Sequence, residues 1–136
     1  MDTASNGNQA VVALVGRVVL AAVFILSGLS KLGAASGVQG YIAGVGLPAP
    51  LLGYIIALVV EIGGGVLLLV GYRTKLVAGV LAAFCVIAAV LFHRALGDQN
   101  QLIHFMKNFA MAGGLLQIVA FGAGRISLDN RSVAGA

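Results

Sequence analysis

The chain has 136 residues, of which 60% are hydrophobic and only 9% are charged, and its mean hydropathy is +1.07. A soluble domain has about 45–50% apolar residues, and a fold of this size cannot bury such an excess away from water. The composition therefore excludes an ordinary soluble enzyme. The formal net charge is +4, but the eight Lys and Arg residues are scattered along the chain, so no nucleic-acid-binding surface is expected.

The N-terminal part of the chain predicts a tail, a membrane-spanning helix and a long loop. Residues 1–10 are polar or small and lack apolar periodicity, which predicts a disordered tail. Val11–Leu32 is a nearly unbroken apolar run, long enough to cross a hydrocarbon core of about 30 Å. Gly33–Pro50 is rich in Gly and ends in two prolines, which predicts a loop. Its middle part, Val38–Val45, is expected to form a short helix at the membrane interface.

Three further apolar runs predict three further membrane spans. They are separated by a basic turn and by a polar connection, and a polar tail follows the last one. The spans are Leu51–Val70, Leu76–Phe92 and Phe105–Phe121, the connections are 71–75 and 93–104, and the tail covers 125–136. The sequence therefore predicts an all-α polytopic membrane protein, a four-transmembrane-helix bundle formed by residues 11–124.

The basic residues predict the orientation of this bundle. Four spans place both termini on one side of the membrane, together with the turn between the second and third spans. That side carries Arg17, Arg73, Lys75, Arg125 and Arg131, whereas the other carries Lys31, Arg94 and Lys107. By the positive-inside rule, both termini are expected in the cytoplasm.

Glu61 is the first candidate for chemistry, because it lies near the centre of the second span. An ionised carboxylate at that depth is costly unless it is paired or lies beside water. Arg17 lies inside the first span and is long enough to be considered as its partner. A Glu61–Arg17 pair could fix the helix register without any functional role, or Glu61 could act in proton transfer.

A second group of polar residues is expected at the opposite ends of the helices. Lys31 ends the first span, His93 and Arg94 follow the third, and Lys107 and Asn108 begin the fourth. Lys107 and Asn108 stand between aromatic residues and could hold the head of a lipid-soluble ligand such as a quinone. His93 could exchange protons there, since its pKa lies near neutrality. The alternative is that the cations reach to the lipid headgroups and the aromatic residues form an interfacial belt.

The sequence indicates no metal, haem or nucleotide cofactor. Cys85 is the one cysteine and lies in an apolar run, so a thiol pair within one chain is impossible. His93 and His104 stand eleven positions apart without a nearby cysteine or carboxylate cluster, which is poor spacing for zinc.

Several short motifs, in this order and spacing, resemble the DoxX family. They are Phe24-Ile25-Leu26-Ser27-Gly28-Leu29-Ser30-Lys31-Leu32, Gly46-Leu47-Pro48, Glu61-Ile62-Gly63-Gly64, Phe92-His93, Phe105-Met106-Lys107-Asn108 and Gly113-Gly114-Leu115-Leu116. The resemblance covers residues 14–129 and implies a four-helix protein of the bacterial inner membrane. It also singles out by position the residues Arg17, Lys31, Glu61, His93, Lys107 and Asn108.

The resemblance implies a link to redox chemistry, because the family takes its name from proteins similar to subunits of a thiosulfate:quinone oxidoreductase. Other members are associated with membrane complexes that handle oxidative or thiol stress. We therefore expect a quinone-associated membrane subunit, with Glu61 and His93 in catalytic roles and with Arg17, Lys31, Lys107 and Asn108 as ligand-binding residues. A redox partner subunit would supply electrons, and a homo-oligomer is compatible with the sequence. The alternative is a non-enzymatic scaffold that recruits partner proteins.

Overall fold

The computed structural model describes residues 3–134, and this part of the chain contains helices and connecting turns but no strand. Within it, four helices are long and apolar enough to cross a membrane: 7–32, 50–70, 74–92 and 99–121. Helices prevail because lipid offers no hydrogen bonds, so each backbone N–H must find a carbonyl within its own segment. The predicted all-α, four-span architecture is confirmed.

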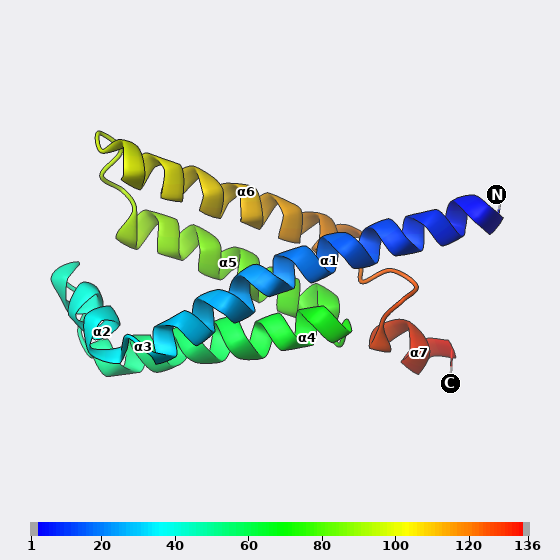
Figure 1. Cartoon of the computed structure of the whole chain (residues 1–136), viewed down its shortest axis with the longest axis horizontal. Coiled ribbons are helices and arrows are strands. Elements are labelled where there is room, and N and C mark those ends of the chain that lie inside the picture. The colour runs from blue at the N-terminus through cyan, green and yellow to red at the C-terminus, as the bar shows by residue number, and fades with distance from the viewer. Residues whose placement is uncertain (1–2, 135–136) are drawn as a thin grey trace.

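The first half of the chain forms a long helix and a broken antiparallel partner (Figure 1). Helix α1 (Thr3–Leu32) is followed by the short α2 (Ala35–Gly44), close to the interfacial helix predicted over 38–45. The second span consists of α3 (Pro50–Leu58), a π-helical turn η1 (Val59–Gly63) and α4 (Gly64–Val70).

The second half forms a helical hairpin and a short terminal helix. Helices α5 (Thr74–Phe92) and α6 (Gln99–Phe121) run side by side, and α7 (Leu128–Ala134) follows. The start of α1 and helix α7 lie at one end of the molecule, whereas α2 and the α5–α6 connection lie at the other (Figure 1). We call these the terminal end and the α2 end.

Several details differ from the prediction, chiefly in the two tails and at the start of α6. Residues 1 and 2 of the predicted disordered tail lie outside the described residues, and the backbone is helical from Thr3 onward. Helix α6 begins at Gln99, inside the connection predicted over 93–104, because the Asp98 side chain accepts a hydrogen bond from the N–H of Asn100 at 2.9 Å and caps the helix. In the predicted tail 125–136, α7 is helical and residues 135 and 136 lie outside the described part.

The core lies where α1, α4, α5 and α6 meet, and small residues allow the close approach. Its buried residues are Ala21, Phe24, Leu68, Val77, Ala78, Leu81, Ala82, Cys85, Ala112 and Leu115. A Cβ added at Gly65 would lie 3.3 Å from the backbone oxygen of Ala21 and 3.2 Å from the backbone nitrogen of Ile25. Van der Waals packing between close backbones thus holds α4 against α1, as is usual for helices in lipid.

The terminal end is closed by hydrogen bonds between distant parts of the chain. The Asp129 carboxylate accepts hydrogen bonds from the N–H groups of Arg73 and Thr74 and from the Thr74 hydroxyl, at 2.6–2.9 Å. It therefore caps the start of α5 from the other end of the sequence. The Asp129 N–H in turn donates to the carbonyl of Gly71 at 2.8 Å, so the tail is attached to the α4–α5 turn.

Candidate functional site

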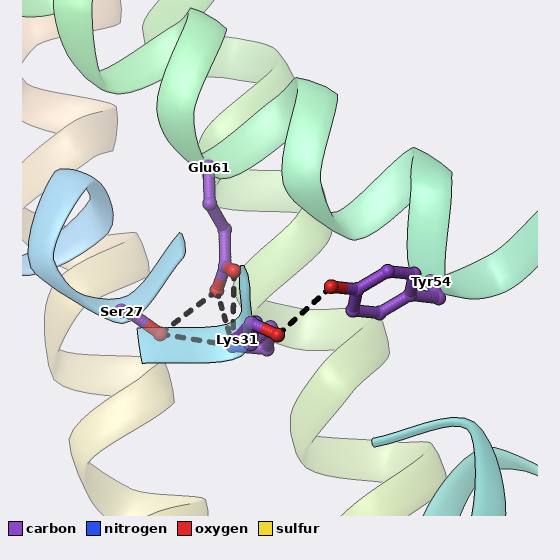
Figure 2. Close-up of polar contacts among 4 residues, drawn as sticks. All are labelled: Ser27, Lys31, Tyr54 and Glu61. Carbon is purple, nitrogen blue, oxygen red and sulfur yellow. Dashed lines mark hydrogen bonds and ion pairs between the residues drawn. The ribbon is translucent and has the colours of Figure 1, made fainter. Parts of the chain in front are cut away.

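Glu61 and Lys31 form an ion pair between the second span and the first. The Lys31 ammonium lies 2.9 Å from Glu61 Oε2 and donates a hydrogen bond to Oε1 at 3.0 Å. Ser27, one turn before Lys31 on α1, donates to Oε1 at 3.1 Å and accepts from the ammonium at 2.9 Å. Figure 2 shows the three side chains converging between η1 and α1. We refer to Ser27, Lys31 and Glu61 as the polar triad.

The local backbone explains how Glu61 reaches α1. Glu61 is the central residue of the π-helical turn η1, and such turns inside α-helices are frequent at functional sites. On the facing helix stands Gly28, where an added Cβ would lie only 2.5 Å from Ile62 Cγ1 and 3.3 Å from Glu61 Cβ. The absence of a side chain at Gly28 therefore permits η1 to lie against α1, which places the carboxylate beside Lys31.

The polar triad is unequally buried. The Glu61 side chain is 6% exposed and the Lys31 side chain 28% exposed. A carboxylate at this depth is stabilised by its cation and by two hydrogen bonds at Oε1, since an unpaired ion would be strongly disfavoured. Lys31 is itself held at the end of α1, where the Tyr54 hydroxyl donates to its carbonyl oxygen at 2.9 Å (Figure 2).

A cavity of about 510 Å³ opens beside the polar triad, and all three of its residues line it. Helices α1, α2, α3, η1, α5 and α6 all contribute to its walls, which are mainly apolar and aromatic. Tyr41 of α2 covers one side, because its ring stacks on Phe92 at 5.6 Å and its hydroxyl donates to the Phe92 carbonyl at 2.9 Å. The cavity has the size and composition of a small-molecule site.

Two histidines and an asparagine form a second polar region of the cavity wall. His93, at the end of α5, stacks on His104 of α6 with ring centroids 5.0 Å apart, and its Nδ1 lies 3.2 Å from Gln101 Oε1. Burial lowers the pKa of His93, the hydrogen bond to Gln101 opposes this shift, and the nearby His104 ring adds to it. Asn108 also lines the cavity, and its amide donates to the His104 carbonyl oxygen at 2.9 Å.

The predicted Glu61–Arg17 pair is wrong. Arg17 is only 2% exposed, but it donates to the backbone carbonyls of Ala123, Ile126 and Leu69 at the terminal end. Lys31 is the partner of Glu61 instead. The physical reason is the depth of the two cations in the membrane. Fourteen residues of helix separate Arg17 from Lys31, which is about 21 Å along α1.

The other predicted site residues divide between the cavity and the surface. Lys31, Glu61, His93 and Asn108 line the cavity, whereas Lys107, Arg94 and Arg17 do not. Lys107 and Arg94 are exposed. On a helix, adjacent residues point in different directions, so Asn108 faces the cavity while its neighbour does not.

Sequence reasoning missed three residues of the site: Ser27, Tyr41 and His104. The spacing of Ser27 four residues before Lys31 was the available signal for the first, since such residues share a helix face. The other two come together only through the packing of α2 and α6. In the described part of the chain, no group of three or more His, Cys, Asp or Glu residues is arranged to hold a metal ion.

Comparisons with known proteins identify relatives over most of the chain. The family model described as DoxX matches residues 12–94. The chain is 34% identical to the inner membrane protein YqjF of Escherichia coli K12 over 116 residues, which cover 85% of this chain and 88% of YqjF. It is 33% identical to the inner membrane protein YphA of the same organism over 126 residues, or 89% of this chain and 90% of YphA. No solved structure gives a significant match.

Proposed function

This chain belongs to the DoxX family of integral membrane proteins, and from that premise we propose that its cavity binds the head group of a quinone. In this proposal the protein is the quinone-holding subunit of a redox-linked membrane complex. A quinone supplies two-electron chemistry when it is bound, and a partner subunit supplies the electrons. The observation that carries the proposal is the polar triad at the wall of a mainly apolar cavity.

The dimensions and lining of the cavity support a lipid-soluble ligand. About 510 Å³ accommodates a substituted ring. Phe24, Phe84 and Phe92 are among the aromatic lining residues, and aromatic side chains give flat apolar contact to a ring.

The polar groups fit the oxygen atoms of such a head group. The ammonium of Lys31 donates to Ser27 and to Glu61 Oε1 and lies 2.9 Å from Glu61 Oε2, so its three protons face these three oxygens. Its positive charge and the second amide proton of Asn108 can both attract an oxygen of the ligand. Because Glu61 balances the charge of Lys31, the polar triad has no net charge, which suits an uncharged ligand.

The test is to purify the protein gently from its own membrane and to look for a quinone by native mass spectrometry and solvent extraction. Lys31→Met/Glu61→Met removes both charges together, so it avoids a lone buried ion, and it should lose the quinone while remaining folded. Lys107→Met is the matched control, because Lys107 is exposed and lies outside the cavity. If the wild-type protein never carries a quinone, this proposal is overturned and the non-enzymatic scaffold is the remaining function.

We also propose that both termini lie in the cytoplasm, with the protein in the inner membrane. The start of α1 and helix α7 lie at the terminal end of the molecule (Figure 1), which also carries the turn with Arg73 and Lys75. The positive-inside rule supports this orientation. A single cysteine introduced at Ser5, with Cys85 changed to Ala, should be labelled by a membrane-impermeant maleimide only after the inner membrane is opened. Labelling in intact spheroplasts would show the opposite orientation and overturn this proposal.

A further inference from the structure

The hydrogen bond between His93 and Gln101 determines which nitrogen of the His93 ring carries the proton. Nδ1 lies 3.2 Å from Gln101 Oε1. With the Gln101 amide oxygen placed toward the ring, Nδ1 is the donor, because an amide oxygen can only accept. In the neutral ring, Nε2 then carries a lone pair and acts as a hydrogen-bond acceptor. The lowered pKa of His93, caused mainly by burial, supports the neutral ring at neutral pH.

His93 Nε2 is an unused acceptor in a cavity wall. Among the described residues, the one hydrogen bond of the His93 side chain is made by Nδ1. The ring is half-buried, lines the cavity and is held in place on its face by stacking on His104. Its orientation is thus fixed by a hydrogen bond on one side and a ring on the other. Such a preorganised acceptor favours a ligand that brings a donor.

The protein's own hydroxyl donors at the cavity are already committed. The Tyr41 hydroxyl donates to the Phe92 carbonyl and the Ser27 hydroxyl donates to Glu61. The second amide proton of Asn108 offers a donor, whereas His93 Nε2 requires one. A hydroxyl meets both needs, because its oxygen accepts and its proton is donated. The carbonyl oxygen of a dione can only accept.

From this arrangement we infer that the bound head group carries a hydroxyl that donates to His93 Nε2, so the cavity prefers the reduced quinol to the oxidised quinone. The inference rests on the proposed function and names the form of its ligand. Quinone binding would leave His93 Nε2 unpaired at the contact surface, and an unpaired acceptor weakens binding. A cavity that binds the quinol more tightly than the quinone would favour reduction of the bound ligand by the partner subunit and would retain the reduced product.

The experiment compares three probes that share a decyl tail: a benzoquinone, its hydroquinone and the dimethyl ether of that hydroquinone. The ether keeps the ring and the oxygens but cannot donate, and it has no redox chemistry. Dissociation constants are measured by anaerobic calorimetric titration of the protein in lipid nanodiscs. The wild type should bind the hydroquinone roughly tenfold more tightly than either other probe, which corresponds to one net hydrogen bond.

His93→Phe keeps a ring for stacking and removes the acceptor, so it should bring the three dissociation constants together. Lys107→Met is the control, because Lys107 is exposed and lies outside the cavity, and this variant should keep the preference. Equal binding of the three probes by the wild type, or tighter binding of the benzoquinone, would overturn the inference and leave quinone binding intact. If none of the probes binds, the proposed function itself fails.

Discussion

The ion pair between Lys31 and Glu61 should be energetically coupled, and the two single variants should have unequal costs. Lys31→Met leaves a carboxylate whose side chain is only 6% exposed with one remaining donor, the Ser27 hydroxyl. Glu61→Met leaves a cation that is 28% exposed and stands at the end of α1, where a flexible lysine side chain can turn toward water or headgroups. The first change is therefore expected to be the more damaging one.

The magnitudes follow from this difference in burial. Removing one partner of a fully buried pair costs about 3–5 kcal/mol, and we expect about 3 kcal/mol for Lys31→Met. Glu61→Met should cost about 1 kcal/mol, close to the value for a partly exposed pair. The double variant should cost about 1 kcal/mol or less, because two well-packed apolar side chains replace a buried pair at little net cost. The resulting coupling is about 3 kcal/mol.

The wild type, the two single variants and the double variant form a double-mutant cycle. Their unfolding in increasing mole fractions of sodium dodecyl sulfate can be monitored by far-ultraviolet circular dichroism. Free energies of unfolding at a common detergent fraction give the coupling directly. A double variant whose cost equals the sum of the two single costs would refute the reasoning. A larger cost for Glu61→Met than for Lys31→Met would also refute the argument from burial.

Three further predictions concern the close approach of α1 to η1 and the terminal end. Gly28→Ala should lower the free energy of unfolding by about 1–3 kcal/mol and weaken ligand binding. Gly113→Ala should do neither, because an added Cβ there meets nothing within 4 Å. Thermal melts compare the stability of the two variants, and titrations compare their ligand binding. Arg17→Met removes the hydrogen bonds to carbonyls at the terminal end and should make segment 122–131 sensitive to limited proteolysis without changing ligand binding. Partial burial raises the pKa of Asp129, but hydrogen bonds from Thr74 and the Arg73 N–H outweigh it and lower the pKa. This carboxylate therefore contributes stability that is complete above about pH 4, its unfolded pKa, and is lost as the pH falls through the lower folded pKa. The melting temperature of Asp129→Asn should therefore fall less on acidification than that of the wild type.

Hydropathy by itself determined the membrane architecture, because lipid permits few alternatives. Every apolar run of about twenty residues must satisfy its backbone internally, so Leu51–Val70 and its counterparts could be predicted as helices without knowledge of their neighbours. The same reasoning marked Glu61 as a residue that needs a partner, since an ion at that depth cannot stand alone. These conclusions depend on each segment and its solvent, and on nothing further along the chain.

The identity of that partner was decided only by the tertiary structure. Arg17 and Lys31 lie on the same helix and both carry a positive charge, so composition could not choose between them. The choice depends on the register of η1 against α1, which follows from the π-helical turn and from the missing side chain at Gly28. Likewise, His93 and His104 are eleven residues apart in sequence and stack only because α5 and α6 form a hairpin. Contacts between helices are set by packing along their whole lengths, and no single segment contains that information.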